Sequence, residues 1–283
     1  MKKQMLAVLL TAAALLLAGC GQEQEPAVQE TIDPYAGMVQ VESGYGPKIW
    51  VEEYEELEVS PFLDWQPELP LPEGYTVQTG VDVSEHQGTL DWAAIAGAGC
   101  EFAIVRAGYR GYGTAGTLCT DACFADNLRG AREAGLALGV YFFSQATEPE
   151  EAEEEADYLL ALLADYGPET FTLPVFFDWE RIEFDHARTD AMGGELLTDC
   201  ALAFCRRIAA AGYTPGVYAY RYLAYFDYDL LRLADYPMWI GALGERSDFY
   251  YTHDVWQYRV STGHPGAAGE LDLDYRFCPI SEN

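Results

Sequence analysis

The chain has 283 residues, of which 50% are hydrophobic and 14% aromatic, and this is enough to bury one large core. Acidic residues outnumber basic ones by 46 to 16, which gives a formal net charge of −30. Because affinity for nucleic acid depends largely on Lys and Arg that neutralise phosphates, this charge excludes nucleic acid as a partner.

The first twenty residues have the pattern of an export signal. Two lysines precede an apolar run over residues 5–17, which is short for a membrane span, and small residues then lead to Cys20. The sequence Leu-Ala-Gly-Cys at 17–20 resembles the lipobox of bacterial lipoproteins, in which the cysteine is lipidated and becomes the mature N-terminus. We therefore expect a signal peptide over residues 1–20 and an anchor at Cys20 on the outer face of the bacterial cell membrane. Ordinary cleavage and release is the alternative.

Residues 21–74 change character along their length. They are rich in Glu, Gln and Pro, with Lys48 as the only base, and the first part predicts an acidic, self-repelling tether. The stretch from Val39 to Trp65 is too apolar for a free linker, since it carries Ile49, Trp50, Val51, Tyr54, Leu57, Val59 and Phe62. We expect part of this stretch to pack on the domain over residues 75–283.

From Tyr75 onward, short apolar runs alternate with amphipathic stretches. In chain order, strands are predicted over residues 77–83, 102–107, 138–143, 175–180, 216–220, 238–242, 255–258 and 271–274. Helices are predicted over residues 90–98, 124–134, 147–166 and 197–211, with Gly135 and Gly212 as stops and Thr147 as an N-cap. Units of one strand and one helix followed by bare strands predict an α/β fold. It is a TIM-like incomplete barrel of eight strands with about five helices, (β/α)5(β)3.

The run Val175 to Glu180, VFFDWE, predicts a buried parallel strand that ends in two carboxylates. Side chains alternate faces along a strand, so Asp178 and Glu180 point the same way, with Cα atoms ~6.6 Å apart. Two acids in one site cannot both ionise freely, and the acid in the drier setting has its pKa raised toward neutrality. This pairing is typical of glycoside cleavage. The alternative is a pair of structural acids that cap the next helix or bind Arg181.

Several polar residues come at the ends of predicted strands. Asp82, Asp178, Glu180, Gln257 and Asp272 all occupy such positions. Because barrel enzymes build their active sites at the C-terminal ends of their strands, the sequence predicts that the acids act together.

Eight motifs occur in order between Tyr75 and Phe277. They are VDVSEHQGTLDW at 81–92, FAIVRAGYRGYG at 102–113, AGLALGVYFFSQA at 134–146, PVFFDWE at 174–180, AGYTPGVYAY at 211–220, WIGALG at 239–244, VWQY at 255–258 and ELDLDY at 270–275. Together they resemble the glycoside hydrolase family 25 lysozymes, also called the Chalaropsis type. The resemblance implies a barrel of eight strands with five α/β units, and a protein that acts on peptidoglycan glycan strands. We also expect a monomer.

The resemblance also implies a chemistry. The bond cleaved would be the β-1,4 bond between N-acetylmuramic acid and N-acetylglucosamine, with Glu180 as the general acid. Asp178 would orient or polarise the 2-acetamido group of the substrate, which itself attacks the anomeric carbon. Asp82 and Asp272 would support this pair and the substrate. No metal or organic cofactor is implied.

Further residues of these motifs are candidates for binding sugars. They are Arg106, Tyr109, Tyr112, Tyr141, Tyr218, Trp239, Trp256 and Gln257. The alternative for the aromatic residues is burial in the core, and we expect His86 to be a polar loop residue near the rim. Phe142 stands where the family often has histidine, and Asp274 where it often has asparagine. These departures concern contacts in the groove more than the acid pair.

Two other interpretations keep the fold. One is a wall-binding lipoprotein that does little chemistry, against which a costly cluster of like charges argues. The other is a hydrolase of a related glycan, such as a chitin-like polymer. The six cysteines after Cys20 permit disulfides in fifteen pairings, and without a C-x-x-C or a His/Cys cluster no zinc site is expected.

Overall fold

The computed structural model describes residues 33–43, 46–182 and 186–280. The chain divides into two units, residues 1–36 and 37–283, and the described helices and strands all belong to the second unit. The signal peptide and Cys20 lie outside the described residues. Within the described ranges, no helix combines the length and the apolarity that a membrane span requires.

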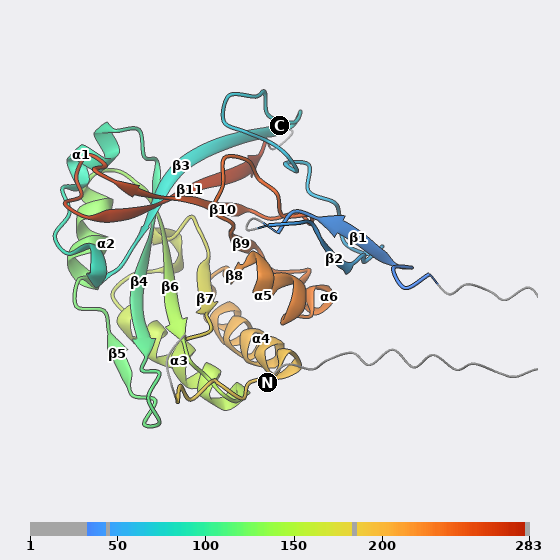
Figure 1. Ribbon diagram of the computed structural model, residues 1–283. Helices are drawn as coiled ribbons and strands as arrows, with labels where there is room; N and C mark the ends of the chain where they lie inside the picture. Colours follow the sequence, from blue (N-terminus) through green and yellow to red (C-terminus); the bar gives the residue numbers. More distant parts are fainter. Residues whose placement is uncertain (1–32, 44–45, 183–185, 281–283) are drawn as a thin grey trace, which may run out of the picture. The chain divides into compact units, whose positions relative to one another are not determined.

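Eight strands of the described chain close a barrel (Figure 1). They are β3 (Tyr75–Val83), β4 (Phe102–Arg110), β6 (Ala137–Ser144), β7 (Val175–Trp179), β8 (Pro215–Tyr220), β9 (Met238–Gly241), β10 (Val255–Thr262) and β11 (Glu270–Pro279). Neighbours from β3 to β10 run parallel, and β11 closes the barrel by pairing antiparallel with both β10 and β3. The predicted α/β barrel of eight strands is confirmed.

Helices connect the parallel strands. The described helices are α1 (Trp92–Gly97), α2 (Phe124–Glu133), α3 (Pro149–Leu162), α4 (Gly194–Ala210), α5 (Arg221–Phe226) and α6 (Leu230–Leu233), with 3-10 turns η1 (Glu85–Gln87) and η2 (Pro168–Thr170). Gly135 and Gly212, which follow α2 and α4, have φ values of 81° and 89°, in the left-handed region expected for helix stops. The sequence did not predict α5, α6 or the three short strands β1 (Met38–Val41), β2 (Ile49–Glu52) and β5 (Leu118–Thr120).

The N-terminus of α3 differs from the prediction. Glu148, and not Thr147, is the N-cap residue, and its side chain makes no capping hydrogen bond. Thr147 instead donates from both its backbone N–H and its hydroxyl to Glu151 Oε2, at 2.8 and 2.9 Å. The hydroxyl is therefore paired with a carboxylate one turn into the helix, which leaves it no role as a backbone cap.

Each barrel strand presents one face to the interior and one to the outer layer. A cluster of large side chains fills the interior, made of Phe102, Ile104, Tyr141, Leu173, Phe176, Tyr218, Trp239 and Val255. Glycines make room for these rings, since a Cβ on Gly216 would lie 2.6 Å from the ring of Phe176. The larger cluster contains helix residues such as Leu128 and Leu159, and so lies between the strands and the helices.

We call residues 37–43 and 46–74 the N-terminal strap, and its residues Phe62 and Trp65 cover the outer faces of β10 and β11, strands that no helix follows. Phe62 stacks on Phe277 with ring centroids 3.7 Å apart, and Trp65 meets the ring of Tyr275 edge-on at 5.4 Å. Backbone hydrogen bonds at 2.7 Å from Ser60 and Asp64 join the strap to residues 247–250. The strap thus supplies the layer that helices supply elsewhere around the barrel.

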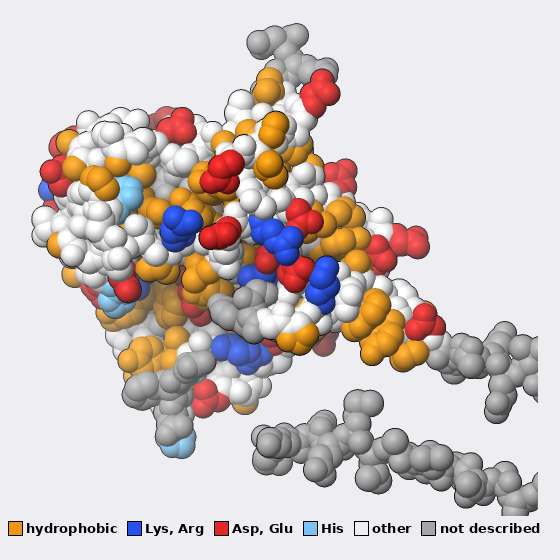
Figure 2. Space-filling model, turned by 45° about the horizontal axis from the view of Figure 1, so that its top comes forward, with side chains coloured by type: hydrophobic (Ala, Val, Ile, Leu, Met, Phe, Trp, Pro, Cys, Tyr) orange, Lys and Arg blue, Asp and Glu red, His pale blue; other side chains and the backbone are white. Residues whose placement is uncertain are grey.

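Ion pairs hold the strap at its edge. Arg246 lies 2.5 Å from an oxygen of Asp64 and 3.1 Å from one of Glu42. On the face that Figure 2 shows, acidic and basic side chains intermingle. The net charge of −30 is therefore not gathered into one acidic patch on that face.

Phe62→Ala should lower the free energy of unfolding by roughly 3–5 kcal/mol, because it leaves a cavity against Phe277 and Tyr75. Chemical denaturation of the purified chain measures this change. The control is Leu69→Ala in the same strap, where the side chain is 50% exposed and the expected change is within about 0.5 kcal/mol. Equal effects of the two substitutions would mean that the strap is not part of the cooperative core.

Candidate active site

A cleft of about 480 Å³ opens at the C-terminal ends of the parallel strands. The four acids expected to act together line it: Asp82, Asp178, Glu180 and Asp272. The predicted sugar-binding residues that also line it are Arg106, Tyr109, Tyr112, Tyr141, Tyr218, Trp239 and Gln257. His86 is exposed and lies at the same cleft. The structure therefore brings into one place residues that are up to 190 positions apart in the chain.

Strand β7 positions the central pair of acids. Asp178 lies on β7 between Phe143 of β6 and Tyr218 of β8, and Glu180 comes directly after the last strand residue, Trp179. Trp179 belongs to the outer core and is 1% exposed, so alternation turns both acids into the cleft. Oδ1 of Asp178 is buried and has no hydrogen-bond partner among the described residues.

Asp82 is held by a short chain of hydrogen bonds. Gln257 donates from Nε2 to Asp82 Oδ2 at 2.8 Å, and Tyr218 donates its hydroxyl to Gln257 Oε1 at 2.9 Å. The register of β3 and β11 places Asp82 opposite Asp272. Antiparallel closure of the barrel is thus what brings these two acids together.

Asp274 is a member of the acid cluster that the sequence marked only as a departure from the family. It is fully buried two residues beyond Asp272, and Trp239 donates from Nε1 to its Oδ1 at 2.8 Å. Burial raises the pKa of Asp274 well above its usual range, and the charge of Asp82 raises it further. Its other carboxyl oxygen, Oδ2, is buried and has no hydrogen-bond partner among the described residues. The pairing with Trp239 could not be found by sequence because 35 positions separate the two residues.

Trp256 is not in the cleft, and its prediction as a sugar contact is wrong. Gln257 faces the barrel interior, so its neighbour Trp256 must face outward. It is 1% exposed, lies against Trp65 and Tyr275, and donates from Nε1 to the carbonyl of Ala242 at 2.8 Å. The alternation rule that places the acids would also have excluded this tryptophan.

The aromatic residues of the cleft fall into two groups. Tyr141, Tyr218 and Trp239 belong to the barrel interior and are at most 8% exposed, so they form the floor and offer little free surface. Tyr112 is 45% exposed and Tyr220 38%, so their rings are open to a ligand. The sequence did not single out Tyr220, although it lies two positions after Tyr218.

Arg106 is fixed on one wall of the cleft. Its Nε donates to Asp121 Oδ2 at 2.7 Å, and its Nη2 lies 3.3 Å from an oxygen of Glu85. Its guanidinium lies over the ring of Tyr109, 5.2 Å from the centroid. The positive charge of Arg106 opposes the rise in the pKa of Asp178. The sequence did not identify Asp121, which is buried and holds this arginine in place.

Burial and mutual repulsion raise the pKa values of the cleft acids. Burial, assisted by the charge of Asp272, raises the pKa of Glu180 to about 7. Burial and then Glu270 raise the pKa of Asp272 to about 6. For Asp178, burial and then the charge of Glu180 raise the pKa well above the usual range. Glu180 is therefore an acid that can give up a proton near neutral pH.

Within the described ranges, no group of three or more His, Cys, Asp or Glu side chains is arranged to hold a metal ion. The six cysteines after Cys20 are all free thiols in the structure: Cys100, Cys119, Cys123, Cys200, Cys205 and Cys278.

The raised pKa of Glu180 predicts that stability falls as pH rises. The carboxyl titrates at about 4.3 in an unfolded chain and at about 7 in the folded protein, so its contribution is complete below about pH 4 and is lost as pH rises through about 7. Glu180→Gln should remove this part of the dependence of stability on pH. The melting temperature of the variant should therefore fall less than that of the wild type between about pH 4 and pH 7.

Thermal unfolding of both proteins across the range measures the difference. Glu68→Gln, at an exposed acid of the strap, is the control and should keep the slope of the wild type. If the melting temperatures of Glu180→Gln and the wild type change with pH in the same way, the raised pKa of Glu180 is contradicted.

Comparison with known sequences gives a consistent result. The profile of the family described as glycosyl hydrolases family 25 matches residues 81–267. The chain is 25% identical over 197 residues to the autolytic lysozyme of Clostridium acetobutylicum, covering 69% of this chain and 54% of that protein. It is 32% identical over 101 residues to lysozyme M1 of Streptomyces globisporus, covering 36% of this chain and 32% of that protein. The chain thus spans about half and about a third of the lengths of these relatives.

Solved structures share the fold. The modular autolysin LytC from Streptococcus pneumoniae matches with a TM-score of 0.63 at 21% identity, over 84% of this chain and 56% of that one. The bacterial lysozyme from Streptomyces coelicolor matches with a TM-score of 0.58 at 22% identity, over 70% of this chain and 90% of that one. Because the family profile covers more than half of the sequence, from the end of β3 to the residues just before β11, the chain belongs to glycosyl hydrolases family 25.

Proposed function

We propose that the protein is a muramidase, which hydrolyses the β-1,4 bond between N-acetylmuramic acid and N-acetylglucosamine in peptidoglycan. The observation that carries this proposal is the pairing of Glu180, with a pKa of about 7, and the buried Asp178 in one cleft of the family's barrel. Membership of the family and relatives named as lysozymes support it. A structure of LytC in complex with a synthetic peptidoglycan ligand, similar to this fold, is consistent with it.

In the proposed reaction, protonated Glu180 gives its proton to the glycosidic oxygen as the bond to the leaving sugar breaks. The carbonyl oxygen of the 2-acetamido group attacks the anomeric carbon of the same sugar, which forms a cyclic intermediate. Water then opens this intermediate, and the Glu180 carboxylate takes the proton from the water. The configuration is retained, as in other enzymes that use assistance by the substrate.

Asp178 is suited to assist the acetamido group. Its buried Oδ1 lacks a partner among the described residues, and an amide N–H of the substrate would supply one. Accepting this hydrogen bond would orient the acetamido group and make its carbonyl oxygen a better nucleophile. Asp82 and Asp272 would add negative charge that stabilises the developing oxocarbenium ion, an effect that is stronger where water is partly excluded.

Glu180→Gln should lower the rate of glycan cleavage by about 10²–10⁴-fold, because it removes the proton donor and leaves the volume nearly unchanged. Purified peptidoglycan is digested with the chain from residue 33 onward, and the fragments are analysed by mass spectrometry before and after borohydride reduction. New reducing ends on muramic acid, produced by the wild type and by the exposed-site control Glu68→Gln, are the expected result.

Full activity of Glu180→Gln would remove Glu180 from the role of acid. Reducing ends on glucosamine alone would identify a different glycosidase. Intact glycan that retains the wild-type protein would favour a wall-binding lipoprotein without catalysis.

We further propose that the chain is exported, lipidated at Cys20, and held as a monomer on the outer face of the bacterial cell membrane. The supporting observation is the apolar run over residues 5–17 that leads to Leu-Ala-Gly-Cys at 17–20. Dual or triple acylation would give stable anchoring where a single chain would not.

Cys20→Ala should release the protein from the membrane fraction, because it removes the atom that carries the lipid. Fractionation of cells with and without detergent measures the distribution. Cys119→Ala, at a partly exposed cysteine of β5, is the matched control and should remain with the membrane. Detergent-dependent sedimentation of Cys20→Ala would indicate a different anchor.

A further inference from the structure

Gln145 lies behind the general acid and not in the cleft. It directly follows β6 and is fully buried. Its Nε2 donates to the backbone carbonyl of Glu180 at 3.1 Å and to that of Ser144 at 2.8 Å. Its Oε1 accepts a hydrogen bond from the hydroxyl of Thr189 at 3.0 Å. One side chain therefore contacts the segment after β7 at two points.

The sheet itself ends where this contact begins. The last registered pair of β6 and β7 is Ser144 with Trp179, so Gln145 and Glu180 are the next residues on each strand. With the ladder at an end, the side-chain amide of Gln145 provides the hydrogen bond that the backbone of a neighbouring strand would otherwise provide. An amide suits this position, because it can donate to a carbonyl and accept from a hydroxyl at the same time.

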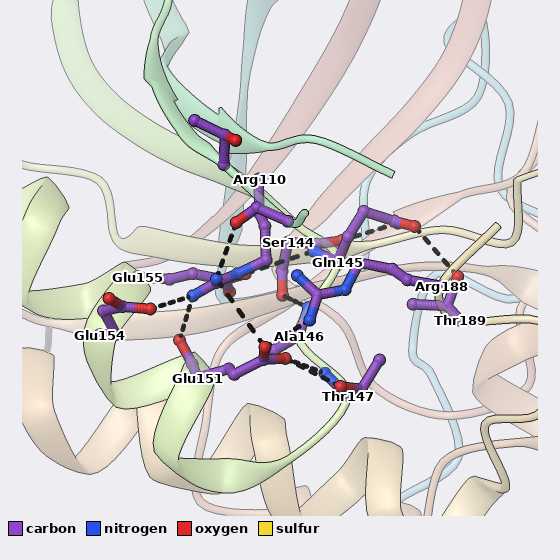
Figure 3. A network of polar contacts seen from close by, with 12 residues as sticks. Arg110, Ser144, Gln145, Ala146, Thr147, Glu151, Glu154, Glu155, Arg188 and Thr189 are labelled. Atoms are coloured by element: carbon purple, nitrogen blue, oxygen red, sulfur yellow. Dashed lines mark hydrogen bonds and ion pairs between the residues drawn. The ribbon is translucent and has the colours of Figure 1, made fainter. Parts of the chain in front are cut away.

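Gln145 is itself firmly held. Its backbone N–H donates to Glu155 Oε1 at 3.3 Å, and Arg110 donates from Nε to the same oxygen at 2.7 Å. Glu155 is fully buried on α3, and Arg110 also donates from Nη2 to the carbonyl of Glu151 at 2.9 Å. As Figure 3 shows, this network joins the end of β4, the first turns of α3 and the loop after β6. The backbone of Gln145 is therefore tied through Glu155 and Arg110 to both α3 and β4.

We propose that Gln145 is a positioning residue for Glu180: its side-chain amide fixes the backbone of the acid at the point where strand β7 has ended. This inference rests on the proposed role of Glu180 as the general acid. Because Gln145 does not line the cleft, its effect on the substrate is only through Glu180.

Loss of the Gln145 amide should affect turnover more than binding. Misplacement of a catalytic group by about 1 Å can cost about 100-fold in rate, so we expect kcat to fall by about 10–100-fold. KM should stay within about twofold, since the groups that contact the sugars are unchanged.

The pH profile separates positioning from general damage to the fold. The titratable groups that face Glu180 are Asp178 on β7, Asp82 on β3, Asp272 on β11 and Tyr218 and Tyr220 on β8. All of them remain when Gln145 is replaced. A Glu180 carboxyl that is freed toward water loses part of the burial that raises its pKa to about 7, so the alkaline limb of the kcat profile should move to lower pH. A smaller folded fraction would lower the whole profile without moving this limb.

The test compares Gln145→Met with Thr189→Val. The first removes the bond to Glu180, whereas the second removes only the hydroxyl that Gln145 Oε1 accepts from and keeps the bond to Glu180. Gln145→Met leaves the carbonyl of Glu180 without this donor, and Thr189→Val leaves Gln145 Oε1 without its donor, so both variants should have a lower melting temperature. Only Gln145→Met should lower kcat by about 10–100-fold and shift the alkaline limb. Should Gln145→Met fail to fold, Gln145→Asn, whose amide is too short to reach the carbonyl, serves in its place.

Glu180→Gln is measured in the same series, so that the two proposals can fail separately. An active Glu180→Gln protein would overturn the role of the acid, whatever Gln145 does. If Glu180→Gln is inactive but Gln145→Met keeps the wild-type kcat, or loses kcat with the alkaline limb unmoved, the positioning role of Gln145 is overturned. The same shift in Thr189→Val as in Gln145→Met would also overturn it, because that variant keeps the bond to Glu180.

Discussion

Several carboxyl groups lie close together at one end of a closed barrel, and the rest of the structure has to hold them there against their mutual repulsion. Burial opposes the ionisation of Asp82, Asp178, Glu180 and Asp272, and each charge raises the pKa of a neighbour. An open sheet could relieve this repulsion by letting its edge strands move apart. In this barrel β11 pairs with both β10 and β3, so Asp272 stays opposite Asp82. Closure of the sheet is thus what keeps the acids at close range.

The strand that closes the barrel also lacks a helix to cover it, and this explains the N-terminal strap. Phe277 and Tyr275 of β11 and Trp256 of β10 would otherwise present an apolar outer face to water. Phe62 and Trp65 of the strap cover that face. Residues far from the cleft therefore stabilise the strand that carries Asp272. The hydrolase unit begins in the strap and not at the first barrel strand.

Features that follow from one strand's own periodicity could be predicted from the sequence. Alternation along VFFDWE placed Asp178 and Glu180 on one side, and the cleft contains both. Residue type alone makes Trp256 a candidate, as a flat surface for sugars, but its position next to Gln257 on the strand turns its side chain outward. The missed features depend on pairs that are distant in sequence, such as Trp239 with Asp274 and Gln145 with Glu180. Local patterns carry no information about such pairs, because the register of the barrel alone brings them together.

The distribution of hydrogen bonds among the acids suggests which group is left for the substrate. Gln257 donates to Asp82 and Trp239 donates to Asp274, whereas Gln145 donates to the backbone carbonyl of Glu180 and not to its carboxyl. Oδ1 of Asp178 and Oδ2 of Asp274 are both buried without a partner among the described residues, but of these two acids only Asp178 lines the cleft. Burying an unpaired carboxylate oxygen is costly, and a ligand that donates a hydrogen bond there would recover part of that cost. In the proposed reaction the donor is the acetamido N–H of the sugar, so an unpaired carboxyl oxygen of the cleft becomes the atom that aligns the nucleophile.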